Sequence, residues 1–427
     1  MGFGRVIGRA VSETVGNFLR MMKKRRKVAG VSKRNRGYLS TMQERPYTNT
    51  VSIVFVCQLP SLWNSLKSAY DASARNSRVK AYIVALPEYR VVLNPDGSEE
   101  NAYGPNEAFS FLAERGYTVI NGYDSRNGTV FDIRTLEPDY VFLPRPYDSY
   151  LPPGYRSGTL VQFTRVCYVN YGFNTSDRLN AIVYSIDFFK NVYAVFPESL
   201  HALRFVKRLL RKYRCTWNNA RYEGYPGFDL IDTGTTGSGE KRVFLWTPRW
   251  TTDEALLGSN FFLLKDQLFS FFAENRHLSL LFRPHPLLIR NFLATGELSD
   301  TDVRDIEQIC DRFPNIVWDK SVDYLESFGK ADALITDPSS LVVEFFFTGK
   351  PVIFCGAPEG FIDVAEKMAG GFYIEKDWNA IESRIRLLAR GVDEKSDLRA
   401  SIVTNSFPGK GVGERILQSL LDDHFAS

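Results

Sequence analysis

Short apolar runs alternate with longer amphipathic segments along most of this chain. Runs of this length, bounded by Asp, Gly and Pro, are typical of strands in a parallel sheet that is covered on both faces. The alternation therefore predicts an α/β fold in which helices flank parallel sheets. The predicted strands lie at 51–57, 79–86, 117–120, 138–143, 160–168 and 192–196, and then at 242–247, 278–283, 316–318, 333–335 and 351–355.

A segment rich in Gly, Thr and Ser at 231–240 separates the two series of strands. Such a composition is typical of a flexible connection. A length of 427 residues suits two or three domains, and 44% hydrophobic residues suffice for sizeable cores. We therefore expect two doubly wound, Rossmann-like domains, 49–230 and 241–427, with the last helix a candidate to pack back on the first. Ligands bind beyond the carboxyl ends of such strands, so two facing domains would form a cleft.

The first 48 residues are set apart by their charge. Residues 1–45 hold twelve Lys and Arg against two Glu, in a chain whose net charge is +4. Apolar residues recur there at helical spacing, which predicts a basic amphipathic helix able to associate with a membrane. The basic cluster after it would be attracted to anionic lipid by about 1 kcal/mol per charge near the surface. The apolar positions are Ile7, Val11, Val15, Phe18 and Met22.

Two other interpretations of this segment are a solvated helix that packs on its own domain and a disordered tail. A nucleic-acid-binding arm is disfavoured, because no aromatic residues interleave with the basic run. Arg9, Glu13 and Arg20 interrupt the apolar core that a signal peptide needs, and no run reaches the roughly 18 apolar residues of a spanning helix. We expect a cytoplasmic protein held peripherally on the inner face of the cell membrane, with no nucleic-acid partner.

The five cysteines and four histidines do not indicate a metal or redox site. The cysteines are odd in number and never form a CxxC pair, which argues against a disulfide framework and a thiolate zinc site. No HExxH pair occurs. Asp300 and Asp302 form a DxD, but before a helix such a pair is more typical of a cap. We therefore expect neither a metal nor a cofactor, and a reducing compartment.

The stretch at 333–355, ALITDPSSLVVEFFFTGKPVIFC, is the strongest candidate for a ligand site. Asp337 and the proline after it end a strand, and Ser339 is a good N-cap for the short helix that follows. A helix start at the carboxyl end of a parallel strand favours a phosphate, because it presents free N–H groups and a positive dipole end. Ser340 and Glu344 share a helix face, so Glu344 would lie near the adjoining sugar. The other interpretation is an ordinary capped core helix.

Two more strand ends carry side chains suited to an anion. FRPHP at 282–286 delivers Arg283 and His285 to the sheet edge, two donors suited to a diphosphate. The TPRWT sequence supplies Arg249 to the same edge. The alternative for His285 is a loop histidine that hydrogen bonds to the backbone, and the alternative for Arg249 is a surface arginine in a turn. GYPGFD at 224–229 passes close to a ligand or turns between domains, and a structural turn is the favoured explanation.

In this order, the motifs GYPGFD, FLWTPRW, FRPHP and LITDPSS, followed by a glutamate and GKPVIF, resemble the CDP-glycerol glycerophosphotransferase family, the teichoic-acid polymerases and related capsule enzymes. The resemblance covers 224–355 well and extends more loosely to the C-terminus. It implies a GT-B fold with the nucleotide donor in the C-terminal domain and the acceptor in the cleft. The donor site that it implies has diphosphate contacts from His285 and Arg283, phosphate contacts from Ser339 and Ser340, and a ribose contact from Glu344. From their strand-end positions we also expect Arg249 and Asp337 in the donor site.

The chemistry that the resemblance implies is phosphoryl transfer. An acceptor hydroxyl attacks the phosphorus that carries glycerol, and CMP leaves. His285, Arg283 and the helix dipole would neutralise the leaving phosphate without a metal.

The general base is the point at which this sequence departs from the family. The family's Trp-His-Gly motif, whose His is the proposed base, falls on Asn170, Tyr171 and Gly172, within CYVNYGFN. Tyr171 thus takes the catalytic position, although a tyrosine with a pKa near 10 is a poor base at neutral pH. Asp177 and Asp148 are the other candidates.

Three functions are compatible with these residues. The first is a membrane-associated transferase that moves glycerol phosphate, or another polyol phosphate, from a CDP-linked donor to a hydroxyl of a surface polymer or lipid-linked acceptor. The second is a GT-B glycosyltransferase that uses a nucleotide sugar for capsule or lipopolysaccharide. The third is a non-catalytic relative that binds a nucleotide. The oligomeric state is left open.

Overall fold

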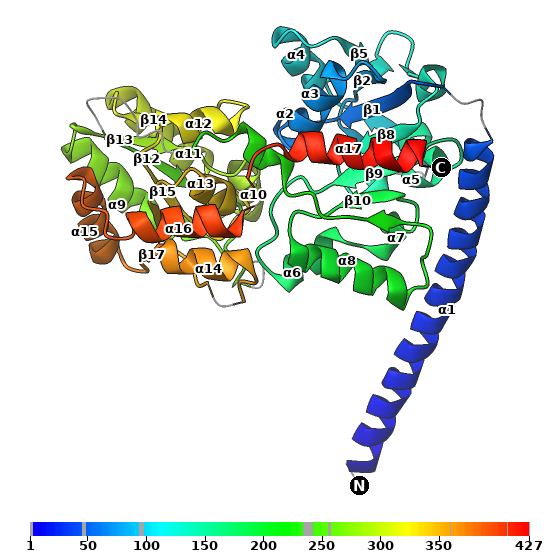
Figure 1. Ribbon diagram of the computed structural model, residues 1–427. Coiled ribbons are helices and arrows are strands. Elements are labelled where there is room, and N and C mark those ends of the chain that lie inside the picture. Colours follow the sequence, from blue (N-terminus) through cyan, green and yellow to red (C-terminus); the bar gives the residue numbers. More distant parts are fainter. Residues whose placement is uncertain are drawn as a thin grey trace. The chain divides into compact units, whose positions relative to one another are not determined.

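A computed structural model of the chain describes residues 3–44, 48–93, 98–233, 242–254, 258–358, 360–407 and 409–426, with only the backbone of 3–17, 93 and 99. The chain divides into two compact units, whose elements are labelled in Figure 1. The C-terminal helix belongs to unit 1, and most of the predicted 231–240 connection lies outside the described residues. Unit 1 consists of Met1–Tyr171, Arg178–Pro226 and Gly411–Ser427, and unit 2 of Gly172–Asp177 and Gly227–Lys410.

Unit 1 is built on a seven-stranded parallel sheet with the order β11-β10-β9-β8-β1-β2-β5. β1 (Val51–Cys57) pairs with β2 (Val79–Ala85), with Val51 opposite Val79. The other strands are β5 (Val119–Asn121), β8 (Tyr140–Leu143), β9 (Arg165–Val169), β10 (Ala194–Phe196) and β11 (Asn219–Ala220), beside two antiparallel hairpins, β3 (Tyr89–Leu93) with β4 (Glu99–Tyr103) and β6 (Tyr123–Asp124) with β7 (Thr129–Val130).

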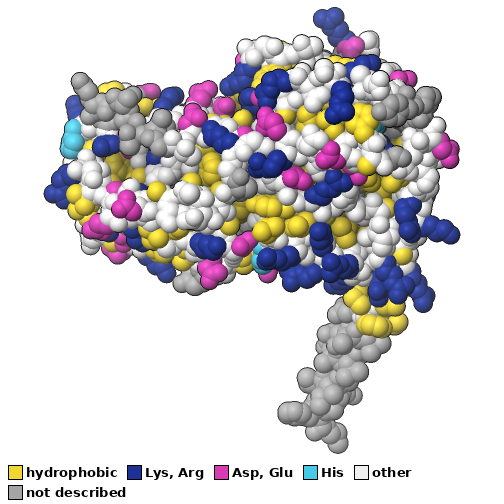
Figure 2. All heavy atoms as spheres, in the orientation of Figure 1, with side chains coloured by type: hydrophobic (Ala, Val, Ile, Leu, Met, Phe, Trp, Pro, Cys, Tyr) yellow, Lys and Arg dark blue, Asp and Glu magenta, His cyan; other side chains and the backbone are white. Residues whose placement is uncertain are grey.

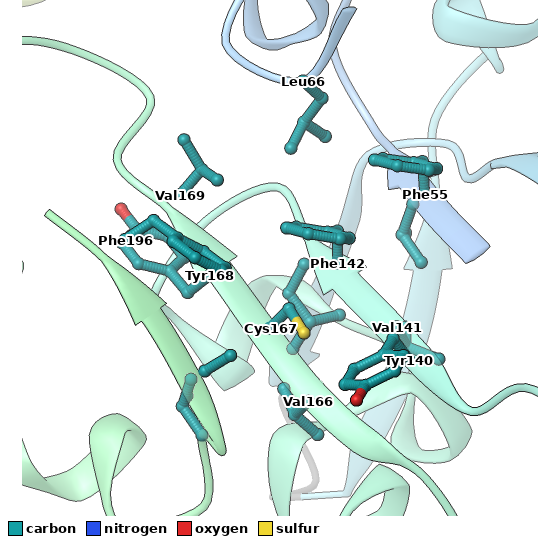
Figure 3. Packing of buried hydrophobic residues seen from close by; sticks show 14 of the residues in the cluster. Phe55, Leu66, Tyr140, Val141, Phe142, Val166, Cys167, Tyr168, Val169 and Phe196 are labelled. Atoms are coloured by element: carbon teal, nitrogen blue, oxygen red, sulfur yellow. The ribbon is translucent and has the colours of Figure 1, made fainter. Parts of the chain in front are cut away.

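The core of unit 1 is formed by apolar residues of these strands, some of which are seen in Figure 3. Every residue of β1 is buried, and its Phe55 stacks on Phe142 of β8 with ring centroids 4.8 Å apart. Tyr168 of β9 is also buried. Near-continuous apolar runs are what strands covered on both faces require. The strand predicted at 160–168 starts only at Arg165, because 157–160 form a short helix.

The helices of unit 1 include the C-terminal one, α17, which packs against α3 (Figure 1). Asp423 of α17 accepts hydrogen bonds from the Tyr193 hydroxyl at 2.7 Å and from Arg221 Nη2 at 2.8 Å. The bounds are α1 (Phe3–Gln43), α2 (Pro60–Trp63), α3 (Lys67–Arg75), α4 (Glu107–Glu114), α5 (Ser157–Leu160), α6 (Asp177–Val183), α7 (Ile186–Phe189), α8 (Leu200–Lys212) and α17 (Val412–Phe425), with 3₁₀ turns at Ile133–Leu136, Asp148–Tyr150 and Pro153–Tyr155.

We predict that Gly413→Ala destabilises unit 1. A Cβ at Gly413 would lie 2.3 Å from the backbone carbonyl of Ser68 in α3, so the two helices would have to separate. The cost of about 3 kcal/mol exceeds the gain of about 1 kcal/mol that alanine normally brings inside a helix. Thermal unfolding should show a midpoint lowered by roughly 5–10 °C. Gly370→Ala in unit 2 is the control, because its Cβ would meet only Leu398 Cδ2 at 4.0 Å; equal midpoints for both variants would contradict the close contact.

The second half of α1 is part of unit 1. Val28, Ser32 and Asn35 are buried. Asn35 Nδ2 donates to the Lys190 carbonyl at 3.0 Å, and Ser32 Oγ accepts from the backbone N–H of Thr216 at 3.0 Å. For this half of the 1–48 segment, the interpretation of a helix that packs on its own domain is therefore confirmed.

The first half of the same helix carries the predicted apolar face. The side chains of Ile7, Val11 and Val15 lie outside the described residues, and the Phe18 side chain is exposed. Within the part of the chain that the structure describes, no helix has the length and apolarity needed to cross a bilayer.

Unit 2 is built on a six-stranded parallel sheet with the order β14-β13-β12-β15-β16-β17. Its first five strands confirm the predicted ones to within one residue at each end. The strands are β12 (Arg242–Thr247), β13 (Leu278–Phe282), β14 (Ile316–Trp318), β15 (Ala333–Thr336), β16 (Val352–Phe354) and β17 (Tyr373–Ile374). The helices are α9 (Phe261–Glu274), α10 (Leu288–Thr295), α11 (Asp300–Arg312), α12 (Tyr324–Lys330), α13 (Leu341–Phe347), α14 (Val364–Gly371), α15 (Trp378–Ala389) and α16 (Ser396–Ser406).

Two motifs have structural roles in unit 2. Asp302 forms a capping box with Ser299 at the start of α11, so the cap interpretation of the DxD is confirmed. GYPGFD contributes to the 3₁₀ turn Pro226–Leu230, and its Phe228 stacks on Phe347 with centroids 4.4 Å apart. The structural explanation of that motif is therefore confirmed.

Each sheet has one topological switch point, where two central strands lie side by side. The strands that follow one of them in the chain are added on one side of the pair, and those that follow the other are added on the opposite side. In unit 1 these strands are β1 and β8, and in unit 2 they are β12 and β15. The loops that leave the carboxyl ends of two such strands diverge and leave room for a ligand. The topology of each unit thus marks one edge position where a ligand is expected.

Candidate functional site

At the switch point of unit 2, the loops that follow β12 and β15 are tied together. The hydroxyls of Thr247 and Thr336, which end the two strands, hydrogen bond at 2.7 Å. The backbone N–H of Arg249 donates to Asp337 Oδ2 at 2.9 Å, and Arg249 Nη1 donates to the Pro338 carbonyl. These bonds hold Arg249 and the serine pair after Pro338 at one edge of the sheet.

Arg249 keeps an unused donor at this edge. Its Nε is buried and has no hydrogen-bond partner among the described residues. Burial lowers the pKa of the guanidinium, against the opposing effect of Asp337. A buried N–H without a partner costs about 1–3 kcal/mol, which an anionic oxygen would recover. Arg249 is thus a partly buried cation rather than a surface arginine in a turn.

Asp337 is buried and its carboxylate is saturated with hydrogen bonds. Oδ2 accepts from Arg249 N and from Ser259 Oγ at 2.7 Å. Oδ1 accepts from the backbone N–H of Asn260 at 3.1 Å and from its Nδ2 at 3.0 Å. A carboxylate so engaged would repel a phosphate rather than bind it. We therefore assign Asp337 a positioning role, in which it holds the loop after β12 against the loop after β15.

The serine pair has hydroxyls that the helix does not use. Ser340, not Ser339, is the N-cap of α13, and it makes no side-chain capping bond, so the predicted cap was wrong. Ser339 Oγ is buried and lacks a partner among the described residues. Gly172 lies directly against Ser340, since a Cβ on it would come within 3.2 Å of the Ser340 Cβ. The absence of a capping bond leaves both hydroxyls available to a ligand.

His285 lies on the neighbouring loop, after β13. Its backbone N–H donates to the Pro248 carbonyl at 3.0 Å, which ties it to the Arg249 loop. Its Nδ1 accepts from the backbone N–H of Leu287 at 3.1 Å, so the ring proton resides on Nε2. Burial, with a smaller contribution from the positive charge of Arg249, lowers the pKa of His285 to about 4. His285 is therefore a neutral, oriented Nε2–H donor at neutral pH.

Arg283 reaches the same edge but is already paired. Its Nη1 donates to Asp319 Oδ2 at 2.8 Å, to Ser321 Oγ at 2.9 Å and to Ser327 Oγ at 3.3 Å. Burial acts to raise the pKa of Asp319, but hydrogen bonds from Ser321, Ser327 and Arg283 outweigh it and lower that pKa. Arg283 therefore holds an internal ion pair next to β14, and a diphosphate would have to compete with Asp319 for it.

Glu344 is buried on α13, one turn after Ser340. Its carboxylate accepts a hydrogen bond from the hydroxyl of Tyr324 on α12. The sequence predicted a ribose contact for Glu344, and the structure adds Tyr324 as the group that orients it.

Tyr171 follows β9 at the carboxyl edge of the sheet in unit 1. Burial and the neighbouring Tyr147, with which it hydrogen bonds, raise its pKa well above the usual tyrosine range. Tyr171 is therefore neutral at physiological pH, where it can orient a hydroxyl but cannot deprotonate one.

The two acids considered as alternative bases have different surroundings. Asp148 accepts from the backbone N–H and the hydroxyl of Ser157, both at 2.7 Å, and so caps α5. Asp177 is exposed and opens α6.

The switch point of unit 1 contains a pair that the motifs did not indicate. Gln58 follows β1 and Arg145 follows β8, and Arg145 Nη2 donates to Gln58 Oε1 at 3.2 Å. The sequence signal that could have indicated this pair is its position. Gln58 comes directly after a predicted strand, and one residue separates Arg145 from the end of another. Without the strand order, nothing distinguished these two strand ends from the others.

Comparison with known proteins places these features in context. Residues 169–359 match the model of a family described as CDP-Glycerol:Poly(glycerophosphate) glycerophosphotransferase. This match confirms the resemblance predicted from the motifs, and the matched segment contains all eight predicted site residues, whereas Gln58 and Arg145 precede it. No curated protein sequence matches the chain.

Several solved structures are similar over most of the chain. The wall teichoic acid polymerase TagF has a TM-score of 0.50 at 15% identity, covering 96% of this chain and 98% of that one. UDP-GlcNAc 2-epimerase from Neisseria meningitidis, bound to UDP-GlcNAc, has a TM-score of 0.55 at 10% identity, covering 87% and 100%. S. aureus MnaA with UDP has a TM-score of 0.55 at 13% identity, covering 88% and 97%. At these identities the similarity shows the fold, and it confirms the predicted GT-B-like class.

Proposed function

We propose that this chain transfers glycerol phosphate from CDP-glycerol to a hydroxyl of a wall polymer and releases CMP. The match of residues 169–359 to the glycerophosphotransferase family supports this activity. The observation that carries the proposal is that three donors without an acceptor among the described residues, His285 Nε2, Arg249 Nε and Ser339 Oγ, lie on three loops that hydrogen bonds join at the carboxyl edge of the unit 2 sheet. A nucleotide diphosphate is a ligand that needs such donors.

In the proposed reaction the acceptor oxygen attacks the phosphorus that carries glycerol. A new P–O bond forms, the bond from that phosphorus to the CMP oxygen breaks with its electron pair on CMP, and the acceptor proton leaves to solvent. His285 and Ser339 would donate hydrogen bonds to the oxygens that gain charge, and Arg249 would add a positive charge. Because His285 is oriented by Leu287 before any ligand binds, little reorganisation is needed.

Tyr171 would contact the acceptor hydroxyl and orient it. Its raised pKa keeps the phenol protonated, so this role is hydrogen bonding rather than proton removal. Arg283, held by Asp319, would shape the donor pocket. Glu344, oriented by Tyr324, would contact the ribose. Neither Asp148 nor Asp177 is favoured as a base by its surroundings.

A donor screen tests the proposal against its two alternatives. Purified chain is incubated with CDP-glycerol, CDP-ribitol, a UDP-sugar or a CMP-sugar, with a glycerol-phosphate-primed lipid acceptor, and nucleotide release is measured. CMP release from CDP-glycerol that depends on the acceptor supports the proposal. Release of UDP from the sugar donor indicates the glycosyltransferase alternative, and nucleotide binding without turnover indicates the non-catalytic alternative. A capsule-type acceptor is compared in the same assay.

We also propose that the chain acts at the inner face of the membrane, through a basic surface made by α1 and α8. On α8 the exposed residues include Arg204, Lys207, Arg208 and Arg211. Figure 2 shows Lys and Arg side chains gathered over this part of unit 1. The two helices approach each other at Tyr213, whose ring centroid lies 6.0 Å from Lys24 Nζ of α1 and 5.7 Å from Lys212 Nζ of α8. A hollow of about 380 Å³ beside α1 is lined by Lys23, Lys24, Lys27, Val28, Asp187 and Lys190.

Neutralising the α8 face should weaken membrane binding. Each basic residue near an anionic surface contributes about 1 kcal/mol, so the quadruple Gln variant of Arg204, Lys207, Arg208 and Arg211 should bind anionic vesicles at least 100-fold less tightly. Sedimentation with vesicles containing 30% phosphatidylglycerol measures this. The matched control replaces four exposed basic residues of unit 2, Arg276, Arg290, Arg304 and Lys330. Equal losses in both variants would argue for a general charge effect and against this surface.

A further inference from the structure

The switch point of unit 1 holds a cation with few partners. Arg145 Nε is buried and has no hydrogen-bond partner among the described residues. Among the described residues, Gln58 is the one hydrogen-bond partner of its side chain, and no described carboxylate forms an ion pair with it. A guanidinium has five N–H donors, and removing a charge from water is costly unless an opposite charge replaces the hydration. Such an arginine is a candidate for binding an anion.

The Arg145 side chain is also held in place before any ligand arrives. Gln58 Nε2 donates to the carbonyls of Pro87 and Tyr150, at 3.2 and 2.7 Å, which turns Gln58 Oε1 toward Arg145. The Tyr150 ring lies 4.5 Å from the Arg145 guanidinium carbon. One loop after β1 and one loop after β8 thus fix the guanidinium at the position where an α/β sheet binds its ligand. Burial lowers the pKa of Arg145, with Glu88 as the largest opposing influence.

We propose that Arg145, oriented by Gln58, binds a phosphate of the acceptor and thereby selects acceptors that carry a phosphodiester next to the reacting hydroxyl. This inference rests on the proposed function, because it assigns the acceptor to unit 1. Tyr171 is in the same electrostatic environment, since Arg145 is one of the groups that influence its pKa. An acceptor phosphate on Arg145 would therefore lie near the tyrosine proposed to orient the hydroxyl.

The test measures binding by the full chain, so that it does not depend on turnover. The probes are a glycerol-phosphate trimer, a neutral glycerol ether of the same length, and CDP-glycerol, each titrated by calorimetry at low salt. Arg145→Gln should bind the trimer about 10- to 100-fold more weakly, the range expected for hydrogen bonds to a charged group. Its affinity for the neutral ether and for CDP-glycerol should stay within twofold. Arg134→Gln is the control with the same charge change, since Arg134 is exposed and pairs with Asp132.

The possible outcomes separate this inference from the proposed function. If the wild-type chain binds CDP-glycerol but not the trimer, or if Arg145→Gln and Arg134→Gln bind the trimer equally, the acceptor subsite is wrong and the transferase assignment stands. If CDP-glycerol does not bind, the proposed function fails, while a trimer affinity lost only in Arg145→Gln still supports an anion site. Arg145→Lys is a second variant in case the glutamine variant misfolds. It keeps the positive charge but loses the planar, forked set of guanidinium N–H donors. Arg145→Lys should bind the trimer with intermediate affinity. Wild-type affinity in a folded Arg145→Lys would contradict phosphate binding by the forked guanidinium donors.

Discussion

His285→Ala should lower kcat for glycerol-phosphate transfer by about 10²–10³-fold while leaving the fold intact. The substitution removes an oriented Nε2–H donor from the charge that develops on the leaving phosphate, and removal of one such donor typically has an effect of this size. The His285 ring is partly buried at a loop, so the expected loss of stability is small. The measurement is CMP release at saturating CDP-glycerol. The control is His277→Ala, because His277 is exposed in the same unit, before β13.

The pH dependence adds a second check on the state of His285. With a pKa lowered to about 4 by burial and by Arg249, His285 stays neutral as the pH falls from 8 to 5. Since kcat/KM reports the free enzyme, kcat/KM for the donor should show no acid limb near pH 6.5 from this residue. Such a limb in the wild type that vanishes in His285→Gln would mean that His285 is protonated near pH 6.5 and loses activity on protonation, which would contradict its lowered pKa; a requirement for the imidazolium would instead appear as an alkaline limb lost in the same variant. Near-normal turnover of His285→Ala would remove His285 from the site.

Asp337→Ala should destabilise unit 2 by about 4 kcal/mol and abolish donor binding with it. The substitution leaves four donors from Arg249, Ser259 and Asn260 without their acceptor in a buried position, and breaking a buried charged network on one side has a cost of this order. Chemical denaturation followed by tryptophan fluorescence measures the loss, because Trp246 is buried in the core of unit 2.

Ser339→Ala is the comparison for Asp337→Ala, because Ser339 is proposed to bind the donor phosphate whereas Asp337 is proposed to position the loops. The Ser339 hydroxyl has no partner among the described residues, so its removal should change stability by less than about 0.5 kcal/mol. Affinity for CDP-glycerol should fall about 5- to 10-fold, because one hydrogen bond to a phosphate is lost. If Asp337→Ala proved as stable as Ser339→Ala, Asp337 would not hold the loops together. Unchanged donor affinity in Ser339→Ala would place the phosphate elsewhere.

The strand ends that carry the donor residues were predictable from local sequence. The apolar runs at 242–247, 278–283 and 333–335 are strands because only buried parallel strands suit short, uniformly apolar segments. Parallel strands that share a sheet bring their carboxyl ends to one edge, so Arg249, His285 and the serine pair had to lie along the same edge.

The roles of individual side chains at that edge were not predictable. Asp337 and Arg283 were both expected to face the donor, yet Asp337 accepts from four donors and Arg283 pairs with Asp319. These partners come from loops 36 to 88 residues away in the chain. Which partner a polar group finds depends on how separate loops pack, and the spacing of residues along the sequence does not reveal that packing.

Local sequence was enough to predict two helix-flanked parallel sheets, a basic helix before the first strand, and the sheet edge that carries Arg249 and His285, because periodicity and strand-ending residues are local properties. The order of the strands, with β1 beside β8 and β12 beside β15, emerges only in the folded chain. That strand order places Gln58 against Arg145 and leaves Ser339 Oγ and Arg249 Nε without partners among the described residues. Sheet order could not be predicted because it depends on burial and hydrogen bonding between distant segments, which act only once the chain has folded.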